Sequence, residues 1–163
     1  MPFLLSKIIK SIAQPFNIDD RLVNIGISIG YSLVMQSPEL ALKSLNTLSE
    51  AGIRSSIDDF GTGYSSLKYL KIFPIDEIKI DREFVTELST QSVDGKIVEA
   101  ILGLGHSFDL QIVAEGIETQ TAWVFLEDHG CQSGQGYFIS HPLDDKQFNH
   151  WIKQHSQNMK HRD

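Results

Sequence analysis

Four times along the chain, a short apolar segment ends in a polar residue and a segment with helical spacing follows it. The apolar segments are residues 53–57, 75–80 and 110–114, with the last and shortest around 135–138. The helical segments are 65–72, 92–108, 119–129 and 145–155, and an earlier helix begins at Pro38 with Ser37 as its expected N-cap. Before it, residues 17–20 are expected to form a turn and residues 23–34 a strand. Short connections between alternating strands and helices favour right-handed crossovers and parallel strands. The sequence therefore predicts an α/β fold of parallel strands with flanking helices.

Polar residues mark the ends of these predicted strands. They are Asp58, Asp59, Lys79, Glu115 and Gln135. In parallel α/β folds, ligands gather at the carboxyl ends of the strands, so consecutive units should point these side chains at one shared mouth. Three carboxylates and a lysine suit a divalent metal ion and phosphate chemistry. Taken singly, each has a plainer interpretation: a polar turn, a surface lysine lying along the fold, or an acid before a glycine.

The composition narrows the classes of molecule that the chain is expected to bind. The chain has 163 residues and a formal net charge of -7, so broad binding to DNA, RNA or a membrane surface is not expected. It has one cysteine, Cys131, which excludes an internal disulfide and fits a reducing compartment. No apolar run reaches the length of a membrane span, and residues 1–16 are typical of an amphipathic helix rather than a signal peptide. We expect a cytoplasmic protein without a membrane segment.

Four motifs occur in a fixed order. Residues 58–67 read DDFGTGYSSL, 78–81 read IKID, 114–119 read AEGIET, and 135–137 read QGY with a proline at 142. Their sequence and spacing resemble the second half of EAL domains, a family of cyclic-di-GMP phosphodiesterases. The resemblance implies part of a TIM-type (β/α) barrel that hydrolyses cyclic di-GMP to linear pGpG with two Mg²⁺ or Mn²⁺ ions.

The resemblance also implies roles for single residues. Asp58 would bridge both metal ions, and Asp59 would bind one of them. Lys79 would hold the attacking water or a phosphate oxygen. Glu115 would bind a metal ion and its water, near the position of the general base.

The resemblance also implies that four further residues order the loop or contact the substrate. They are Thr62, Tyr64, Glu118 and Gln135. Glu118 and Gln135 would order the loop and the metal-bound water.

The chain departs from the family in its first part. A complete barrel of this type needs roughly 250 residues, and no Glu-Ala-Leu tripeptide occurs here. The stretch aligned with a second metal-binding glutamate of the family is Ser28-Ile29-Gly30-Tyr31. We therefore expect a truncated enzyme that is impaired in isolation. The alternative is a non-catalytic degenerate EAL module that acts in nucleotide binding or protein interaction.

The N-terminal segment has a separate resemblance. Residues 4–33, which include QPF at 14–16 and SIG at 28–30, resemble the closing helix and strands of GGDEF diguanylate cyclase domains, without the GGDEF signature. The predicted organisation is a GGDEF-like remnant at 1–33, half an EAL domain at 34–155 and a polar tail at 156–163. Half a barrel leaves strand edges open, so a homodimer that closes one barrel is a candidate assembly.

Overall fold

The computed structural model describes residues 16–18, 21–23, 37–62, 67–89 and 92–159. Its strands are β1 (Phe16–Ile18), β2 (Arg21–Val23), β3 (Ser56–Phe60), β4 (Glu77–Ile80), β5 (Gln111–Ala114) and β6 (Ser133–Gly134). Its helices are α3 (Pro38–Glu50), α4 (Leu67–Ile72), α5 (Arg82–Val85), α6 (Val93–Ser107), α7 (Gln120–Asp128) and α8 (Asp145–Met159). Residues 1–15 of the helix predicted for 1–16 lie outside the described residues, whereas Phe16 begins β1. The predicted strand after Val23 also lies outside them.

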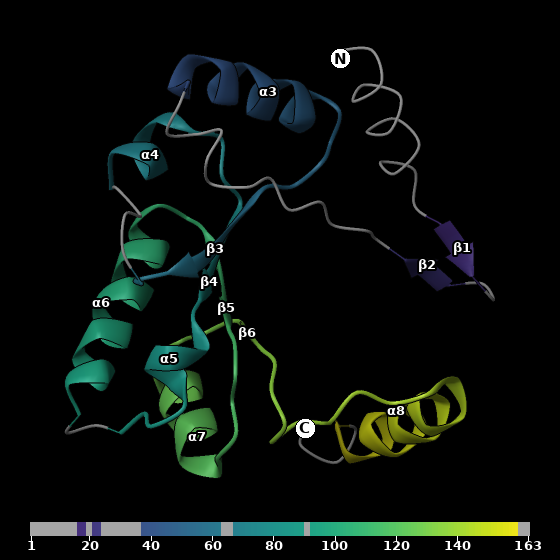
Figure 1. The fold of residues 1–163 in the computed structure, drawn as a ribbon. Helices are drawn as coiled ribbons and strands as arrows, with labels where there is room; N and C mark the ends of the chain where they lie inside the picture. Colours follow the sequence, from purple (N-terminus) through teal and green to yellow (C-terminus); the bar gives the residue numbers. More distant parts are fainter. Residues whose placement is uncertain (1–15, 19–20, 24–36, 63–66, 90–91, 160–163) are drawn as a thin grey trace.

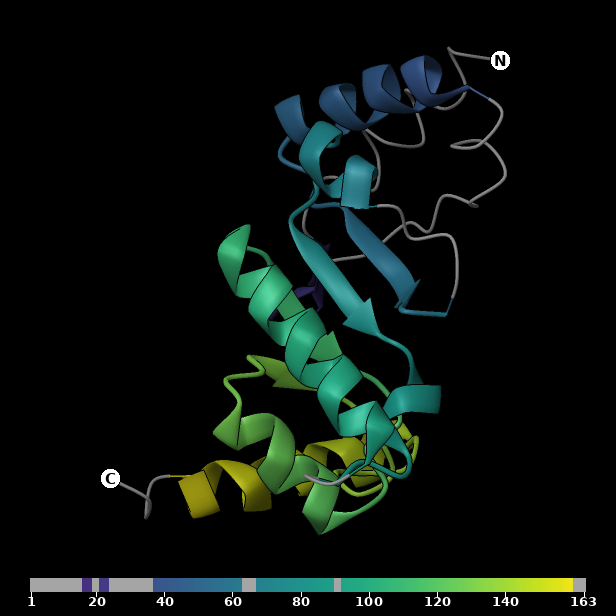
Figure 2. The same ribbon diagram turned by 90° about the vertical axis from the view of Figure 1, so that its left-hand side faces the viewer.

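The main sheet has four strands in the order β3-β4-β5-β6, and every neighbouring pair is parallel. The helices α5, α6 and α7 lie on one side of these strands, as Figures 1 and 2 show. A separate antiparallel pair joins β1 to β2. Parallel strands joined through helices confirm the predicted α/β fold.

The two faces of the sheet differ in polarity. On β4 and β5, the side chains of Ile78, Ile80, Ile112 and Ala114 are fully buried, whereas the residues between them are partly or fully exposed. The buried set packs on the inner sides of α6 and α7 in one continuous core. Strand side chains alternate between faces, so one face of the sheet belongs to the apolar core and the other is polar.

The helix ends follow from local capping. The Ser92 hydroxyl accepts a hydrogen bond from the backbone N–H of Gly95 at 2.9 Å, which starts α6. The Thr119 hydroxyl accepts one from Ala122 at 3.2 Å, which starts α7. Gly52, with φ of 76°, ends α3. The predicted helices 92–108 and 119–129 are confirmed to within one residue at each end.

Four local predictions need correction. Ser37 precedes Pro38 but makes no side-chain capping bond to α3. The strand predicted at 53–57 lies at 56–60, because residues 51–53 still close the end of α3. The last strand lies at 133–134, just before the predicted stretch, and the four-residue helix α5 was not predicted. Residues 17 and 18, predicted as part of a turn, belong to β1.

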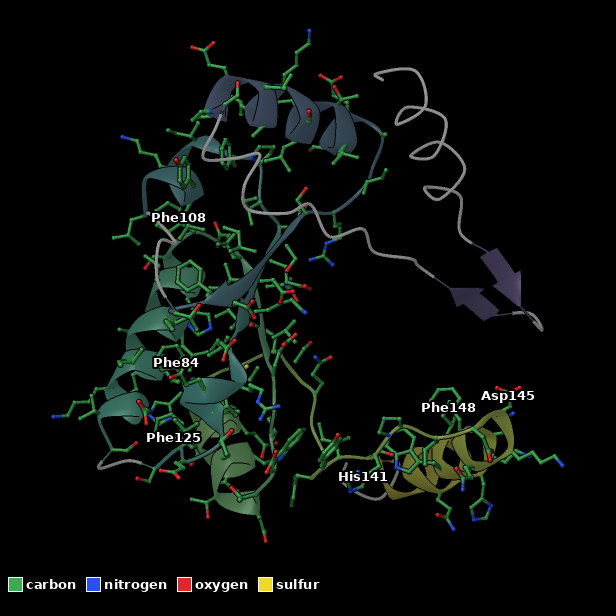
Figure 3. All side chains as sticks on the ribbon, in the orientation of Figure 1. Phe84, Phe108, Phe125, His141, Asp145 and Phe148 are labelled. Atoms are coloured by element: carbon green, nitrogen blue, oxygen red, sulfur yellow. The ribbon has the colours of Figure 1, made fainter. Side chains whose placement is uncertain are left out.

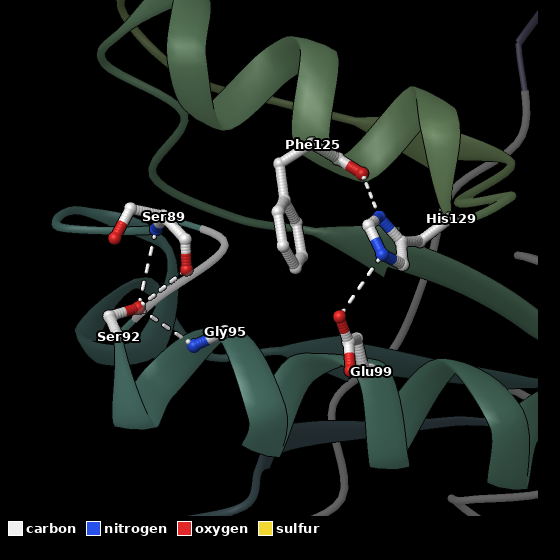
Figure 4. A network of polar contacts seen from close by, with 6 residues as sticks. All are labelled: Ser89, Ser92, Gly95, Glu99, Phe125 and His129. Carbon is white, nitrogen blue, oxygen red and sulfur yellow. Dashed lines mark hydrogen bonds and ion pairs between the residues drawn. The ribbon is translucent and has the colours of Figure 1, made fainter.

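A polar network joins α6 to α7 on the outer side of the core (Figure 4). His129, which follows α7, places its Nδ1 2.7 Å from the carbonyl oxygen of Phe125 and its Nε2 3.1 Å from Glu99 on α6. The ring of His129 also stacks on that of Phe125, with centroids 4.1 Å apart. These contacts hold α6 and α7, the two helices that cover the sheet, in a fixed relative position.

No helix in the described part of the chain has the length and apolarity to cross a membrane.

Candidate functional site

Four side chains form a continuous polar chain across the ends of the four parallel strands. Lys79 on β4 donates a hydrogen bond to Asp58 Oδ1 on β3 at 3.0 Å and forms an ion pair with Glu115, which follows β5. Gln135, which follows β6, donates from Nε2 to Glu115 Oε1 at 2.9 Å. The structure therefore brings four of the predicted site residues into direct contact at one edge of the sheet.

A bulge in β3 sets the position of the two adjacent aspartates. Ile57 pairs with Ile78, but Phe60 pairs with Ile80, so β3 has one extra residue between these points. Asp59 lies in the bulge and has a φ of 51°. This is the left-handed conformation, which aspartate adopts more readily than most residues. Both Asp58 and Asp59 are exposed as a result, while Phe60 returns to the core.

The turn after the bulge is held by Thr62. Its hydroxyl donates a hydrogen bond to the backbone oxygen of Asp59 at 2.9 Å. Gly61 takes φ of 108° and lies against the ring of Phe84, so a side chain there would be both strained and crowded. The predicted loop-ordering residue Thr62 thus fastens the loop to the acidic strand end. Tyr64 lies outside the described residues, and its predicted role stays a prediction.

The electrostatics show an excess of negative charge next to a lysine. A hydrogen bond with Asp81 raises the pKa of Asp59, and slight desolvation and the negative charges of Asp58, Asp81 and Glu115 raise it further. Burial lowers the pKa of Lys79, but its hydrogen bonds to Glu115 and Asp58 and their charges outweigh that effect and raise it overall. Lys79 therefore stays positively charged at neutral pH, where it offsets part of the acidic cluster.

Asp81 was not among the predicted site residues. Its carboxyl group lies beside that of Asp59, whose pKa it raises. Its Oδ1 accepts the backbone N–H of Glu83 at 2.7 Å, which caps α5. Asp81 lies two residues after Lys79, the spacing that keeps side chains on one side of an extended chain. That spacing was the signal available in the sequence.

Close backbone contacts fix the loop that carries Glu115 and Gln135. The backbone N–H of Gln135 donates to the carbonyl of Ala114 at 2.8 Å, and that of Ile117 donates to the carbonyl of Gln135 at 3.1 Å. At Gly136, any Cβ would overlap the backbone of Ile117. The contact between Gln135 and Glu115 is therefore determined by backbone pairing and not only by two flexible side chains.

Glu118 is the remaining predicted site residue. Its side chain is exposed and makes no hydrogen bond or ion pair with another described residue. It lies directly before Thr119, the residue that caps α7. Its predicted role in ordering the loop stays a prediction.

The acidic side chains are suitable ligands for a divalent metal ion, but they do not form a complete coordination sphere. Carboxylate oxygens are the ligands that Mg²⁺ and Mn²⁺ prefer, and the raised pKa of Asp59 reflects negative charge that a cation would relieve. However, no group of three His, Cys, Asp or Glu side chains with metal-binding geometry occurs within the described ranges. The Lys79 ammonium contacts both Asp58 and Glu115. These residues fit part of a coordination sphere.

Parallel strands that end in acids and a lysine, with helices over the opposite face, define a partial (β/α) barrel with an acidic site at its carboxyl edge. The model of the EAL domain family matches residues 4–142. The chain belongs to the EAL domain family, which confirms the resemblance found in the motifs. The match includes the segment for which a GGDEF-like origin is predicted, and that finer assignment stays a prediction.

Named relatives place this family in cyclic-di-GMP signalling. The chain is 46% identical over 121 residues to the bifunctional diguanylate cyclase/cyclic di-GMP phosphodiesterase MucR of Pseudomonas aeruginosa, covering 74% of this chain and 18% of MucR. It is 35% identical over 147 residues to the cyclic di-GMP phosphodiesterase PdeR of Escherichia coli, covering 90% of this chain and 22% of PdeR. The chain thus spans about a fifth of the length of these relatives.

Solved structures show how much of an EAL domain this chain matches. The EAL domain of Mycobacterium smegmatis DcpA superposes with a TM-score of 0.65 at 46% identity, covering 69% of this chain and 51% of that one. The MucR phosphodiesterase in complex with c-di-GMP gives 0.65 at 48% identity, covering 71% and 47%. Klebsiella pneumoniae BlrP1, solved with manganese and cyclic di-GMP, gives 0.61 at 35% identity, covering 67% and 28%. The matched region corresponds to about half of an EAL domain.

Proposed function

We propose that the chain provides the carboxyl-terminal half of a cyclic-di-GMP phosphodiesterase site. The observation that carries the proposal is the position of Lys79, held between Asp58 and Glu115 across neighbouring strand ends. A lysine whose pKa is raised by two carboxylates keeps its positive charge, and a positive charge at this edge suits a phosphate oxygen. The phosphodiesterase names of MucR and PdeR support the same chemistry.

The proposed reaction is the addition of water to one phosphorus of cyclic di-GMP and cleavage of its bond to the 3′ oxygen, which yields linear pGpG. Lys79 holds a phosphate oxygen or the attacking water. Glu115, oriented by Gln135 at 2.9 Å, lies where it can accept a proton from that water. Asp58, Asp59 and Glu115 are the residues that would hold Mg²⁺ or Mn²⁺. Such ions, when bound, activate water and offset the charge of the transition state.

We also propose that the chain by itself is impaired. The described acids contribute only part of a coordination sphere, and the loss of one metal ligand commonly costs orders of magnitude in metal affinity or rate. The same observation favours the second candidate function, a non-catalytic EAL module that binds the nucleotide. The proposed organisation keeps residues 1–33 as a GGDEF-like remnant, 34–155 as the EAL half and 156–163 as a tail.

Two measurements on the purified full chain test the proposal. The first incubates it with cyclic di-GMP and Mn²⁺ and detects pGpG by liquid chromatography, with Asp58→Asn as the control. The second titrates cyclic di-GMP calorimetrically with Ca²⁺ in place of Mn²⁺. We expect binding, with slow turnover that Asp58→Asn abolishes. Binding without any turnover supports the non-catalytic module. A folded chain that neither binds nor cleaves the nucleotide contradicts both functions.

A further inference from the structure

The acidic edge of the sheet holds more carboxylates than cations in contact with them. The carboxylates that lie together there are Asp58, Asp59, Asp81 and Glu115. Among the described residues, Lys79 alone forms ion pairs with any of them, and it contacts Asp58 and Glu115 at once. Binding an anionic nucleotide at this edge therefore calls for positive charge beyond that of Lys79, because like charges repel each other.

A second basic residue, Arg82, begins beside this edge. It follows Asp81 directly and is the first residue of α5, which lies just beyond the arrowhead of β4 in Figure 2. Its Cα and Cβ lie so close to Gly116 that a side chain there would overlap the Cβ of Arg82. Gly116 comes directly after Glu115 in the chain, so the arginine lies against the loop that carries this acid.

The guanidinium group of Arg82 is free to bind a ligand. On α5, Phe84 and Val85 pack against the core, and Figure 3 shows Phe84 on the side of the strands where α6 lies. Arg82 is exposed, and its guanidinium makes no hydrogen bond or ion pair with another described residue. A guanidinium group keeps its charge in proteins, and its planar fork matches two oxygens of one phosphate group.

The two cations therefore differ in what they can offer an anion. A phosphate group that approaches Lys79 shares the ammonium with Asp58 and Glu115, whereas one that approaches Arg82 meets a cation with no such partner. Cyclic di-GMP has two phosphodiester groups, each with one negative charge. If Lys79 holds the group that reacts, the other still needs a cation beside the carboxylates.

We propose that Arg82 binds the second phosphate group of cyclic di-GMP, the one that Lys79 does not hold. The inference rests on the proposed function, since it requires the nucleotide to occupy this edge of the sheet. Arginine also binds the guanine base through paired hydrogen bonds. The phosphate is favoured here because the carboxylates repel an anion and not a neutral base.

The test compares two matched variants of the full chain by calorimetric titration with cyclic di-GMP in the presence of Ca²⁺. Arg82→Met removes the charge but keeps an unbranched stem beside Gly116. Arg54→Met makes the same change at an exposed position before β3, at the opposite end of that strand. We expect Arg82→Met to raise the Kd at least about tenfold, the loss of a charge-assisted hydrogen bond, and Arg54→Met to leave it unchanged.

Two further measurements distinguish binding from a structural role. Without nucleotide, Arg82→Met and the unmodified chain should have the same melting temperature, because the guanidinium has no partner in the chain. Arg82→Lys should recover part of the lost affinity, since it restores the charge without the planar fork. A lower melting temperature for Arg82→Met, together with a Kd for Arg82→Lys as weak as that of Arg82→Met, contradicts phosphate binding.

Titration with GMP and with guanosine, followed by NMR in the presence of Ca²⁺, separates the phosphate from the base. We expect Arg82→Met to weaken the binding of GMP and to leave that of guanosine unchanged. An equal loss for both ligands overturns the assignment to phosphate.

The outcomes for Arg82 and for the proposed function differ. If the unmodified chain and Arg82→Met bind cyclic di-GMP equally well, the role of Arg82 is overturned and the proposed function stands. If the unmodified chain does not bind cyclic di-GMP at all, the proposed function is contradicted and the role of Arg82 falls with it.

Discussion

Lys79 on β4 donates a hydrogen bond to Asp58 on the neighbouring strand β3 at 3.0 Å. The two residues are far apart in the chain, and only the parallel pairing of β3 with β4 brings their side chains together. The same ammonium contacts Glu115 beyond β5. One lysine therefore connects three strand ends and offsets the repulsion between the carboxylates of Asp58 and Glu115.

Replacing Lys79 with methionine should destabilise the fold. The change removes a charge-assisted hydrogen bond and an ion pair, and it leaves Asp58 and Glu115 facing each other. Because Asp58 is 53% exposed, solvent screens part of the effect, and we expect a loss of about 1 kcal/mol. Thermal denaturation measures it, with Lys71→Met on the exposed side of α4 as the control. An unchanged melting temperature for Lys79→Met would contradict the assigned contacts.

The same variant should respond more strongly to a divalent cation. Without the lysine, the space between Asp58 and Glu115 is free for a positive ion, and binding to the folded state stabilises it. We expect Mn²⁺ to raise the melting temperature of Lys79→Met more than that of the unmodified chain, and chelation with EDTA to reverse the gain. Equal shifts in both proteins would show that lysine and metal do not compete for this place.

Asp59→Asn should stabilise the chain at neutral pH. The pKa of Asp59 is raised from its ordinary value of 3.8, so its ionised form is disfavoured in the folded state. The folded state then binds more protons than the unfolded state, and stability falls as the pH rises from 3.8 through the raised pKa. We expect the melting temperature of Asp59→Asn to exceed that of the unmodified chain at pH 7 and the difference to vanish below about pH 4. Glu127→Gln, at an exposed position on α7, serves as the control and should leave the melting temperature at pH 7 unchanged.

Two glycine substitutions should have opposite effects. At Gly136 a methyl group would overlap the backbone of Ile117, so Gly136→Ala should cost about 2 kcal/mol through crowding. At Gly103, within α6, a methyl group meets nothing within 4 Å, and Gly103→Ala should stabilise the helix by up to about 1 kcal/mol. Urea denaturation of both variants measures the difference. A tolerated alanine at Gly136 would mean that the loop carrying Gln135 is not held as described.

Gln135→Glu should introduce a repulsion with Glu115. Gln135 donates to Glu115 at 2.9 Å, and a carboxylate in its place cannot donate when ionised. We expect a lower melting temperature at pH 7, because the donated hydrogen bond is replaced by a contact between two negative charges. Gln120→Glu on the exposed side of α7 is the matched control. The contact is exposed, so a loss above about 1 kcal/mol would indicate a rearrangement of the loop and not simple repulsion.

Periodicity predicted much of the fold. Short apolar segments at 75–80 and 110–114 identified β4 and β5 closely, and helical spacing at 92–108 and 119–129 identified α6 and α7. The predicted element boundaries were wrong where tertiary contacts override the local sequence pattern. The extra residue in β3 and the two-residue strand β6 both depend on pairing with a neighbour, and α5 is too short to show a period.

The sequence by itself determined which segments alternate between strand and helix, which face of each is apolar, and that acids and a lysine stand at the strand ends. Only the tertiary structure decided that Lys79 lies between Asp58 and Glu115 and that Asp81 lies beside Asp59. It also decided that, among the described helices, α5, α6 and α7 cover the same side of the sheet. The physical reason is that side-chain periodicity is a local property of the chain. The order and register of the strands arise from hydrogen bonds between segments about twenty or more residues apart.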